Sequence, residues 1–197
     1  MPELKSGPQQ LVLASGSARR RDLLRQIGME PAIIDPPHID EHHGPRELPA
    51  AYAARMAREK LAAIQPRHRG SWVLAADTVV ACGRRILPKA ETEAEARVCL
   101  ALLSGRRHRV LGGIAVAAPD GRTVERLVTT AVAFKRLTQP EIDAYIATGD
   151  WHGKAGGYAI QGHAASFIPW INGSYGNVVG LSLSDAVAML SGLGWRA

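Results

Sequence analysis

The sequence predicts a mixed α/β fold in a single domain, and three observations favour it. Short apolar runs, such as residues 11–14 and 72–76, are bounded by polar residues, which indicates buried strands. Longer segments, such as residues 50–64, carry apolar side chains at helical spacing. The 197 residues are 46% hydrophobic and 21% charged, which is ordinary globular composition. We therefore expect one domain over residues 1–197, with a polar N-terminal tail at about residues 1–9.

Predicted strands and helices alternate along the chain. Gly28 is placed to end the first helix and Thr92 to cap a later one. Thr138 begins another helix, with Glu141 three positions on, and Gly149 is placed to end it. Proline and glycine predict an irregular loop over residues 36–49. The predicted strands are residues 11–14, 31–35, 71–76 (ending at Asp77), a hairpin over 79–87, 110–118, 123–134 and a segment around Phe167; the predicted helices are residues 18–27, 50–64, 91–103, 138–149 and 184–193.

Charge and hydropathy limit the class of protein. The 24 Lys and Arg residues outnumber the 18 Asp and Glu residues, so the formal net charge is +6, which suits either an anionic partner or solubility. No stretch reaches the roughly 18 uninterrupted apolar residues of a membrane-spanning helix, and the N-terminus has no secretory pattern. We therefore expect a cytoplasmic protein that does not contact membranes. Cys82 and Cys99 form no CxxC motif, and we interpret them as reduced core residues.

A small-residue loop lies between the first strand and the first helix. Ser15, Gly16 and Ser17 are followed by three arginines, Arg19 to Arg21. Backbone N–H groups at a helix N-terminus, hydroxyl donors and guanidinium groups together suit a polyphosphate. The alternative is a solvated helix start with Ser17 as its cap, but three arginines there oppose the helix dipole and an anionic ligand would explain them.

Carboxylates occur at two places that suit catalysis. Asp77 and Thr78 follow an apolar block, and a carboxylate at a strand end suits a metal ligand or a general base. Asp40 and Glu41 lie on the proline-rich loop and are candidates for the same site. A turn aspartate and solvent-exposed acids are the alternatives.

Lysines and one glutamine complete the candidates. Lys60, Lys89 and Lys154 each allow a surface role as well as a functional one. Gln161 follows a glycine-rich segment, and its amide is able to recognise a nucleobase through both a donor and an acceptor.

Six blocks of sequence, taken in order, resemble the Maf family of nucleoside triphosphate pyrophosphatases. They are Leu13-Ala14-Ser15-Gly16-Ser17-Ala18-Arg19-Arg20, Ala57-Arg58-Glu59-Lys60, Ala76-Asp77-Thr78-Val79, Lys154-Ala155-Gly156-Gly157-Tyr158-Ala159-Ile160-Gln161-Gly162, Ile171-Asn172-Gly173-Ser174-Tyr175 and Val179-Gly180-Leu181. The sequence departs from the family's usual pattern at Ala18, Ala90, Leu111 and Ser182, and none of these replaces a proposed charged group.

The resemblance implies a cytoplasmic house-cleaning enzyme that splits a nucleoside triphosphate into the monophosphate and pyrophosphate with a divalent metal, Mg²⁺ or Mn²⁺. It implies a bilobed mixed-sheet fold like that of inosine triphosphatases, with a cleft between the lobes, and a homodimer. By position, Asp77 matches the proton acceptor, and the residues that match the phosphate cleft are Ser15, Arg19, Arg20, Lys60 and Lys89. We expect Glu41, together with Asp77, to hold the metal, with Asp40 as a possible helper.

Three positions separate two branches of the family. Arg19, Thr78 and Gln161 are similar to the branch that acts on dTTP and UTP, whereas the branch that acts on 7-methyl-GTP has Trp, Gln and Glu there. A 7-methyl-GTP or other modified-nucleotide pyrophosphatase is the alternative within the class. A nucleic-acid-binding or division-inhibiting regulator is the alternative from another class, but aromatic residues are only 5% of the chain and none is interleaved with the arginine cluster, which argues against nucleic acid as a partner.

Overall fold

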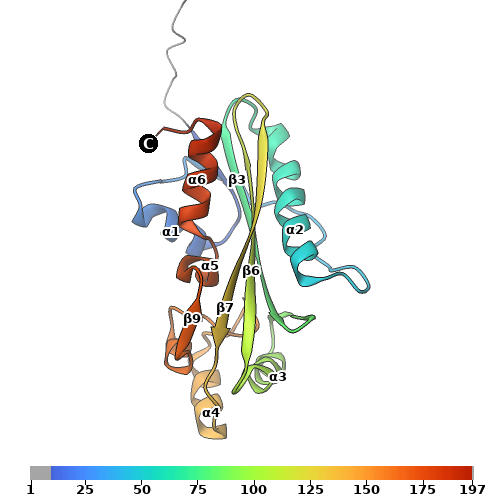
Figure 1. Ribbon diagram of the computed structural model, residues 1–197, viewed down its shortest axis with the longest axis vertical. Helices are drawn as coiled ribbons and strands as arrows, with labels where there is room; N and C mark the ends of the chain where they lie inside the picture. Colours follow the sequence, from blue (N-terminus) through green and yellow to red (C-terminus); the bar gives the residue numbers. More distant parts are fainter. Residues whose placement is uncertain (1–9, 197) are drawn as a thin grey trace, which may run out of the picture.

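A long, twisted mixed sheet organises the protein. The computed structural model describes residues 10–196, so the predicted tail at residues 1–9 lies outside the described part (Figure 1). The main sheet has seven strands in the order β2-β1-β3-β6-β7-β9, and β4 pairs with β3. Its strands are β1 (Leu11–Ala14), β2 (Ile33–Ile34), β3 (Trp72–Cys82), β4 (Arg85–Leu87), β6 (Arg107–Ala117), β7 (Thr123–Ala133) and β9 (Trp170–Asn172).

Helices cover both faces of the first lobe. Helix α2 (Pro49–Ile64) packs on one face of β3 and β6, and the opposite face carries α1 (Ala18–Gln26), α5 (Tyr175–Val179) and α6 (Leu183–Leu193) (Figure 1). A short 3₁₀ helix, η1 (Gln65–Arg67), follows α2. Every helix within residues 10–196 is too short or too polar to cross a lipid bilayer.

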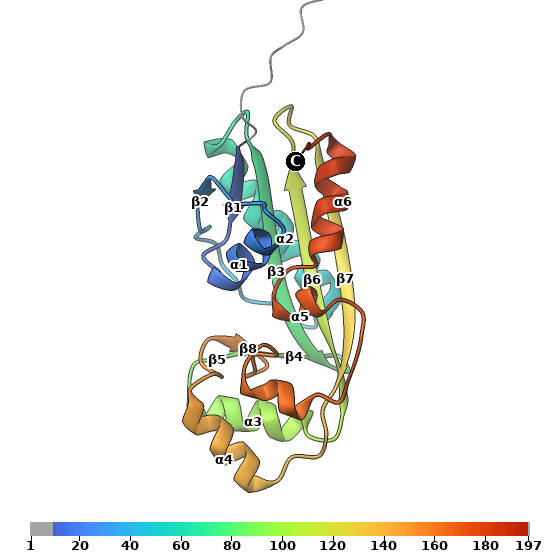
Figure 2. The ribbon, with the colours of Figure 1, turned by 90° about the vertical axis from the view of Figure 1, so that its left-hand side faces the viewer.

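The second lobe is built around the far ends of β3, β6 and β7 (Figure 2). It contains α3 (Glu93–Leu103), α4 (Gln139–Thr148), the 3₁₀ helix η2 (His163–Phe167) and a two-stranded sheet of β5 (Lys89–Ala90) and β8 (Lys154–Ala155). Capping boxes at Thr92 and Thr138 start α3 and α4, as the sequence predicts. The expected α/β class with two lobes is therefore confirmed.

Strand β3 continues well past the position predicted for its end. Asp77 is not at the strand's C-terminal edge but is the sixth of eleven residues. The prediction was wrong because the apolar residues after Thr78 were assigned to a separate hairpin, whereas β3 itself runs on to Cys82 and forms that hairpin with β4. On one edge, β3 pairs with β1 only up to Ala75 and with β4 only from Val80. Among the described strands, none covers this edge at residues 76–79, so the sheet opens beside Asp77.

The strand predicted around Phe167 is also wrong. Phe167 ends η2, and the strand that follows is β9. The Phe167 ring is buried among the rings of Phe134 and Tyr145, so its apolar character comes from filling the second lobe's core and not from a place in the sheet. The short helix α5, which Ser174 caps, was not predicted.

Candidate active site

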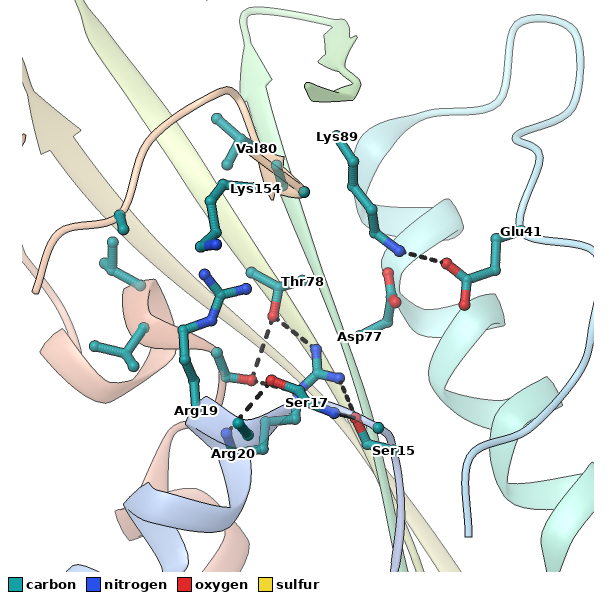
Figure 3. Close-up of a pocket in the computed structure, with 18 of the residues that line it drawn as sticks. Ser15, Ser17, Arg19, Arg20, Glu41, Asp77, Thr78, Val80, Lys89 and Lys154 are labelled. Carbon is teal, nitrogen blue, oxygen red and sulfur yellow. Dashed lines mark hydrogen bonds and ion pairs between the residues drawn. The ribbon is translucent and has the colours of Figure 1, made fainter. Parts of the chain in front are cut away.

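A cavity of about 500 Å³ lies between the two lobes, at the opening in the sheet (Figure 3). This volume is in the range that accommodates a small-molecule ligand. The cavity is lined by nine residues to which the sequence analysis assigns a place in the site, and these are Ser15, Arg19, Arg20, Glu41, Lys60, Asp77, Thr78, Lys89 and Gln161. Residues from distant parts of the chain therefore converge on one cavity.

The loop after β1 forms one side of the cavity. The side chain of Ser17 caps α1 by accepting a hydrogen bond from the backbone N–H of Arg20. Arg19 lines the cavity, and its guanidinium makes no hydrogen bond or ion pair with the described residues. Burial of this charge lowers the pKa of Arg19 from its usual value. Arg19 is therefore a guanidinium available to an anionic ligand.

Arg20 is held differently from Arg19. Its Nε donates to the carbonyl of Gly180 at 2.9 Å, Nη1 to Ser15 Oγ at 2.8 Å and Nη2 to Thr78 Oγ1 at 3.0 Å (Figure 3). Burial lowers its pKa, and the nearby Asp77 carboxylate partly opposes that shift. Arg20 adds positive charge to the cavity, but its planar group is used to join the Ser15 loop, β3 and the end of α5.

On the side of the cavity opposite the Ser15 loop, the carboxylates of Glu41 and Asp77 both contact Lys60. Nζ of Lys60 lies 2.6 Å from Asp77 Oδ1 and 2.8 Å from Glu41 Oε1, and Lys89 Nζ lies 2.6 Å from Glu41 Oε2. Burial would raise the pKa of Glu41, but hydrogen bonds from Lys60 and Lys89 outweigh it and lower the pKa to about 2. Both lysines therefore keep Glu41 ionised.

Two adjacent glycines on β6 pair with Asp77 and Thr78 of β3. Gly113 pairs with Asp77, and a Cβ there would lie 2.1 Å from the Ala53 carbonyl of α2. Gly112 pairs with Thr78, and a Cβ there would lie 1.9 Å from Oδ1 of Asn177 on α5. The missing side chains let α2 and α5 approach opposite faces of the sheet. The Gly-Gly pair inside a predicted strand was the sequence signal for this close approach.

The second lobe supplies the remaining wall. The β5 and β8 pair carries Lys89 and Lys154, and both line the cavity. Burial and the nearby Arg19 charge lower the pKa of Lys154, for which the sequence allows either a surface or a functional role. Gln161 lines the same wall, and its side-chain amide makes no hydrogen bond with the residues described. Its donor and acceptor are both available to a ligand.

Asp40 does not join the site. Its side chain is 79% exposed, bonds to His42 and does not line the cavity, so the expectation that it helps Glu41 with a metal is not supported by its position. The chain turns between these neighbours, and Glu41 alone is held inward by lysines.

The described side chains offer few ligands for a divalent metal. Within residues 10–196 there is no group of three or more His, Cys, Asp or Glu side chains that could hold one. Two carboxylates, Glu41 and Asp77, do converge on Lys60. Mg²⁺ in nucleotide sites commonly uses one or two carboxylates, with the substrate's phosphates as further ligands. The residues present therefore fit a metal that enters with a phosphorylated ligand.

Five cationic side chains surround two carboxylates in a cleft between two α/β lobes, and such an arrangement suits a phosphorylated ligand. The chain belongs to the Maf family, because the family model described as "Maf-like protein" matches residues 10–193.

Curated relatives are similar over nearly the whole chain. A dTTP/UTP pyrophosphatase of Paramagnetospirillum magneticum is 61% identical over 94% of this chain and 97% of its own length. Proteins of the same name from Rhodospirillum rubrum and Caulobacter vibrioides are 59% and 56% identical, over 97% and 98% of this chain and 90% and 100% of their own lengths.

Solved structures show a partial likeness, and one of them serves as an example. A protein described as a nucleoside-triphosphatase and dITP/XTP pyrophosphatase from Mycobacterium abscessus is 18% identical, with a TM-score of 0.42 over 66% of this chain and 74% of that chain. A TM-score this low supports no argument about the site.

Proposed function

We propose that this protein is a pyrophosphatase that hydrolyses dTTP and UTP to the nucleoside monophosphate and pyrophosphate. The observation that carries the proposal is the meeting of Arg19, Arg20, Lys60, Lys89 and Lys154 with Asp77 and Glu41 in one cleft. The names and high identity of the curated relatives support it.

The cationic groups neutralise the triphosphate and stabilise the leaving pyrophosphate. Arg19 has a free guanidinium fork for phosphate oxygens, and Lys60 and Lys89 exchange part of their contact with Glu41 for contact with the substrate. Because Glu41 holds Lys60 and Lys89 at the cleft before the substrate enters, these two lysines need little reorganisation when charge develops on the bridging oxygen.

Asp77 acts on the attacking water. Only its Oδ1 is bonded to another described residue, Lys60, which leaves Oδ2 for the water. The carboxylate takes a proton as the water oxygen bonds to the α-phosphorus, and the bond between that phosphorus and the oxygen leading to the β-phosphate breaks. The electron pair leaves with the pyrophosphate.

Glu41 and Asp77 would hold the divalent metal, Mg²⁺ or Mn²⁺. When bound, the metal supplies Lewis-acid stabilisation of phosphate oxygens. The convergence of both carboxylates on Lys60 supports this assignment, and the substrate's phosphates would complete the ligands.

Gln161 reads the pyrimidine edge, where thymine and uracil offer both a donor and an acceptor to one amide. Arg19 and Thr78 complete the three positions that favour dTTP and UTP over 7-methyl-GTP. We further propose that the enzyme is a cytoplasmic homodimer, on the family resemblance.

The test is pyrophosphate release by the purified protein from a panel of dTTP, UTP, dCTP, GTP and 7-methyl-GTP, with Mg²⁺, Mn²⁺ and EDTA. The proposal expects turnover of dTTP and UTP above all others and none in EDTA. A preference for 7-methyl-GTP would assign the enzyme to the other branch, and no pyrophosphate release from any nucleotide would overturn the proposed activity.

A further inference from the structure

A buried polar contact joins the interior of the second lobe to the wall of the cleft. Nε2 of His108 on β6 lies 2.8 Å from the hydroxyl of Tyr158. The two residues are only 2% and 5% exposed. Tyr158 also lines the cleft, whereas His108 does not. The contact is therefore one layer behind the cleft and takes no part in the mechanism above.

Stability alone does not explain a histidine at this position. Its ring packs edge-on against the rings of Phe134 and Tyr158, in otherwise aromatic surroundings. Its Nδ1 is buried without a hydrogen-bond partner in the described part of the chain. A buried polar atom without a partner lowers stability, and replacing both members of a buried polar pair by apolar groups is often neutral or stabilising.

The segment that contains Tyr158 forms the second-lobe wall. Gly156 and Gly157 come just before it and have φ angles of 69° and 68°. A Cβ at Gly156 would lie 2.9 Å from Val80, and one at Gly157 would lie 3.2 Å from Ala96, so both glycines are in tight contact without a side chain. Tyr158 is therefore the first side chain after them that can fix how deeply the segment sits against the lobe.

Gln161 lies three residues further along the same wall, and its amide has no described protein partner to fix it. Its place in the cleft therefore depends on how the backbone before it is held. Ring contacts alone fix the position of Tyr158 loosely, because aromatic pairs tolerate centroid separations of about 4.5 to 7 Å. The hydrogen bond to His108 restricts the distance between its two heavy atoms to a range of about 0.5 Å and also restricts its angle.

We propose that His108 is a positioning residue for nucleobase selection, because its hydrogen bond with Tyr158 fixes the wall that carries Gln161. The proposal rests on the proposed function, in which Gln161 reads the base. A displacement of about 1 Å at a reacting or recognising group is enough to cost a large factor in rate. His108 therefore positions the wall through its hydrogen bond, although its unpartnered Nδ1 lowers the stability of the protein.

The experiment compares His108→Leu, Tyr158→Phe and the double variant with the wild type. We measure kcat/KM for dTTP and dCTP, which carry the same triphosphate, so their ratio isolates base selection. Each single variant should lower the ratio by about tenfold, and the double variant should lower it no further, because both changes remove one interaction. The double variant should melt at or above the wild-type temperature.

Phe134→Leu is the matched control, since Phe134 packs on the same two rings but contributes no polar atom and does not line the cleft. It should lower the melting temperature and keep the dTTP to dCTP ratio. If the double variant keeps the wild-type ratio, or if Phe134→Leu loses as much of it as the double variant does, the role is only structural and the proposal is overturned.

Amide hydrogen exchange gives a readout that does not depend on catalysis. The amides of residues 153–162 should exchange faster in the double variant than in the wild type. The exchange of the α6 amides should be the same in both proteins. Unchanged exchange over residues 153–162 overturns the proposal even if the ratio falls. A wild type that does not distinguish dTTP from dCTP contradicts the proposed function instead, and the exchange data then still decide whether His108 holds the wall.

Discussion

Lys60 and Asp77 form a buried ion pair on facing elements, with 2.6 Å between Nζ and Oδ1 and exposures of only 5% and 6%. The close approach of α2 at Gly113 makes this pair possible. The hydrogen bond from Lys60 fixes the orientation of the Asp77 carboxylate. It also means that neither charge is able to lose its partner without cost.

Replacing Lys60 with Met should destabilise the protein by about 3 kcal/mol, because Asp77 would be left as a buried charge without a partner. Urea unfolding measures the loss. The double variant Lys60→Met with Asp77→Leu should recover part of the stability, since both buried charges are gone, yet remain inactive. No recovery in the double variant would show that Lys60 acts on stability through other contacts.

Asp77→Asn should abolish pyrophosphate release, by at least about a hundredfold in kcat, because an amide is unable to take the water's proton. The amide oxygen is still able to accept the hydrogen bond from Lys60, so the fold and nucleotide binding should survive. Stopped assays for pyrophosphate and calorimetric binding of dTTP check the two parts. Turnover near the wild-type level would remove Asp77 from its proposed role.

Two neighbouring carboxylates, Glu41 and Asp40, provide a test and a matched control for metal binding. Glu41 faces Lys60 and Lys89 in the cleft, whereas Asp40 is exposed and bonded to His42. Glu41→Gln should raise the Mg²⁺ or Mn²⁺ concentration for half-maximal activity by about tenfold or more, and Asp40→Asn should leave it unchanged. Equal effects of the two variants would contradict the assignment of Glu41 to the metal.

The candidate site was predictable where its chemistry lies in short blocks. Ser15, Arg19 and Arg20 share one loop and helix start, and Asp77 and Thr78 are adjacent on one strand. Ordered blocks of this kind identify the residues of a cleft without any knowledge of their contacts. These residues do line one cavity.

The geometry was not predictable from those blocks. Arg20 is bound by Ser15, Thr78 and Gly180, whereas Arg19 has no partner among residues 10–196. This difference depends on contacts between residues as far apart as 160 positions. Local patterns place two adjacent arginines on the same helix start but do not show which one the fold itself uses.

The fold was predictable where hydrophobic periodicity and turn residues agree. The prediction failed where a buried apolar segment has the same sequence pattern as a strand. The capped helices α3 and α4 begin where Thr92 and Thr138 predict. The apolar stretch at Phe167 does not show by itself whether it lies in a sheet or fills a core, and in the structure it fills a core. A charged residue usually interrupts a buried strand, but Asp77 lies inside β3 because Lys60 compensates its charge.

Gln161→Glu tests base reading directly. Glutamate keeps the size of the side chain but loses the donor, and a carboxylate near an acceptor of the base is repelled. We expect kcat/KM for dTTP to fall by at least about tenfold, with a smaller loss for dCTP, whose exocyclic amine donates a hydrogen bond. An unchanged nucleotide preference in side-by-side turnover would argue against a contact between Gln161 and the base.

His108 should also leave a signature in the dependence of stability on pH. Burial lowers the pKa of His108 to about 4 in the folded protein, against about 6.5 for an ordinary histidine. The unfolded chain therefore takes up a proton at a pH where the folded protein does not. The contribution of the neutral ring is fully present above pH 6.5 and is lost as the pH falls from 6.5 to about 4, by up to about 1.4 kcal/mol per pH unit.

Urea unfolding of the wild type and His108→Leu at several pH values between 4 and 7.5 measures this contribution. The free energy of unfolding of the variant should fall less steeply than that of the wild type over this interval, because it has one titrating group fewer. His152→Leu is the control, since the His152 side chain is 66% exposed and lies outside the aromatic cluster. Parallel curves for the wild type and His108→Leu would show that the folded protein protonates His108 as readily as the unfolded chain does, which contradicts a neutral, buried ring behind the cleft wall.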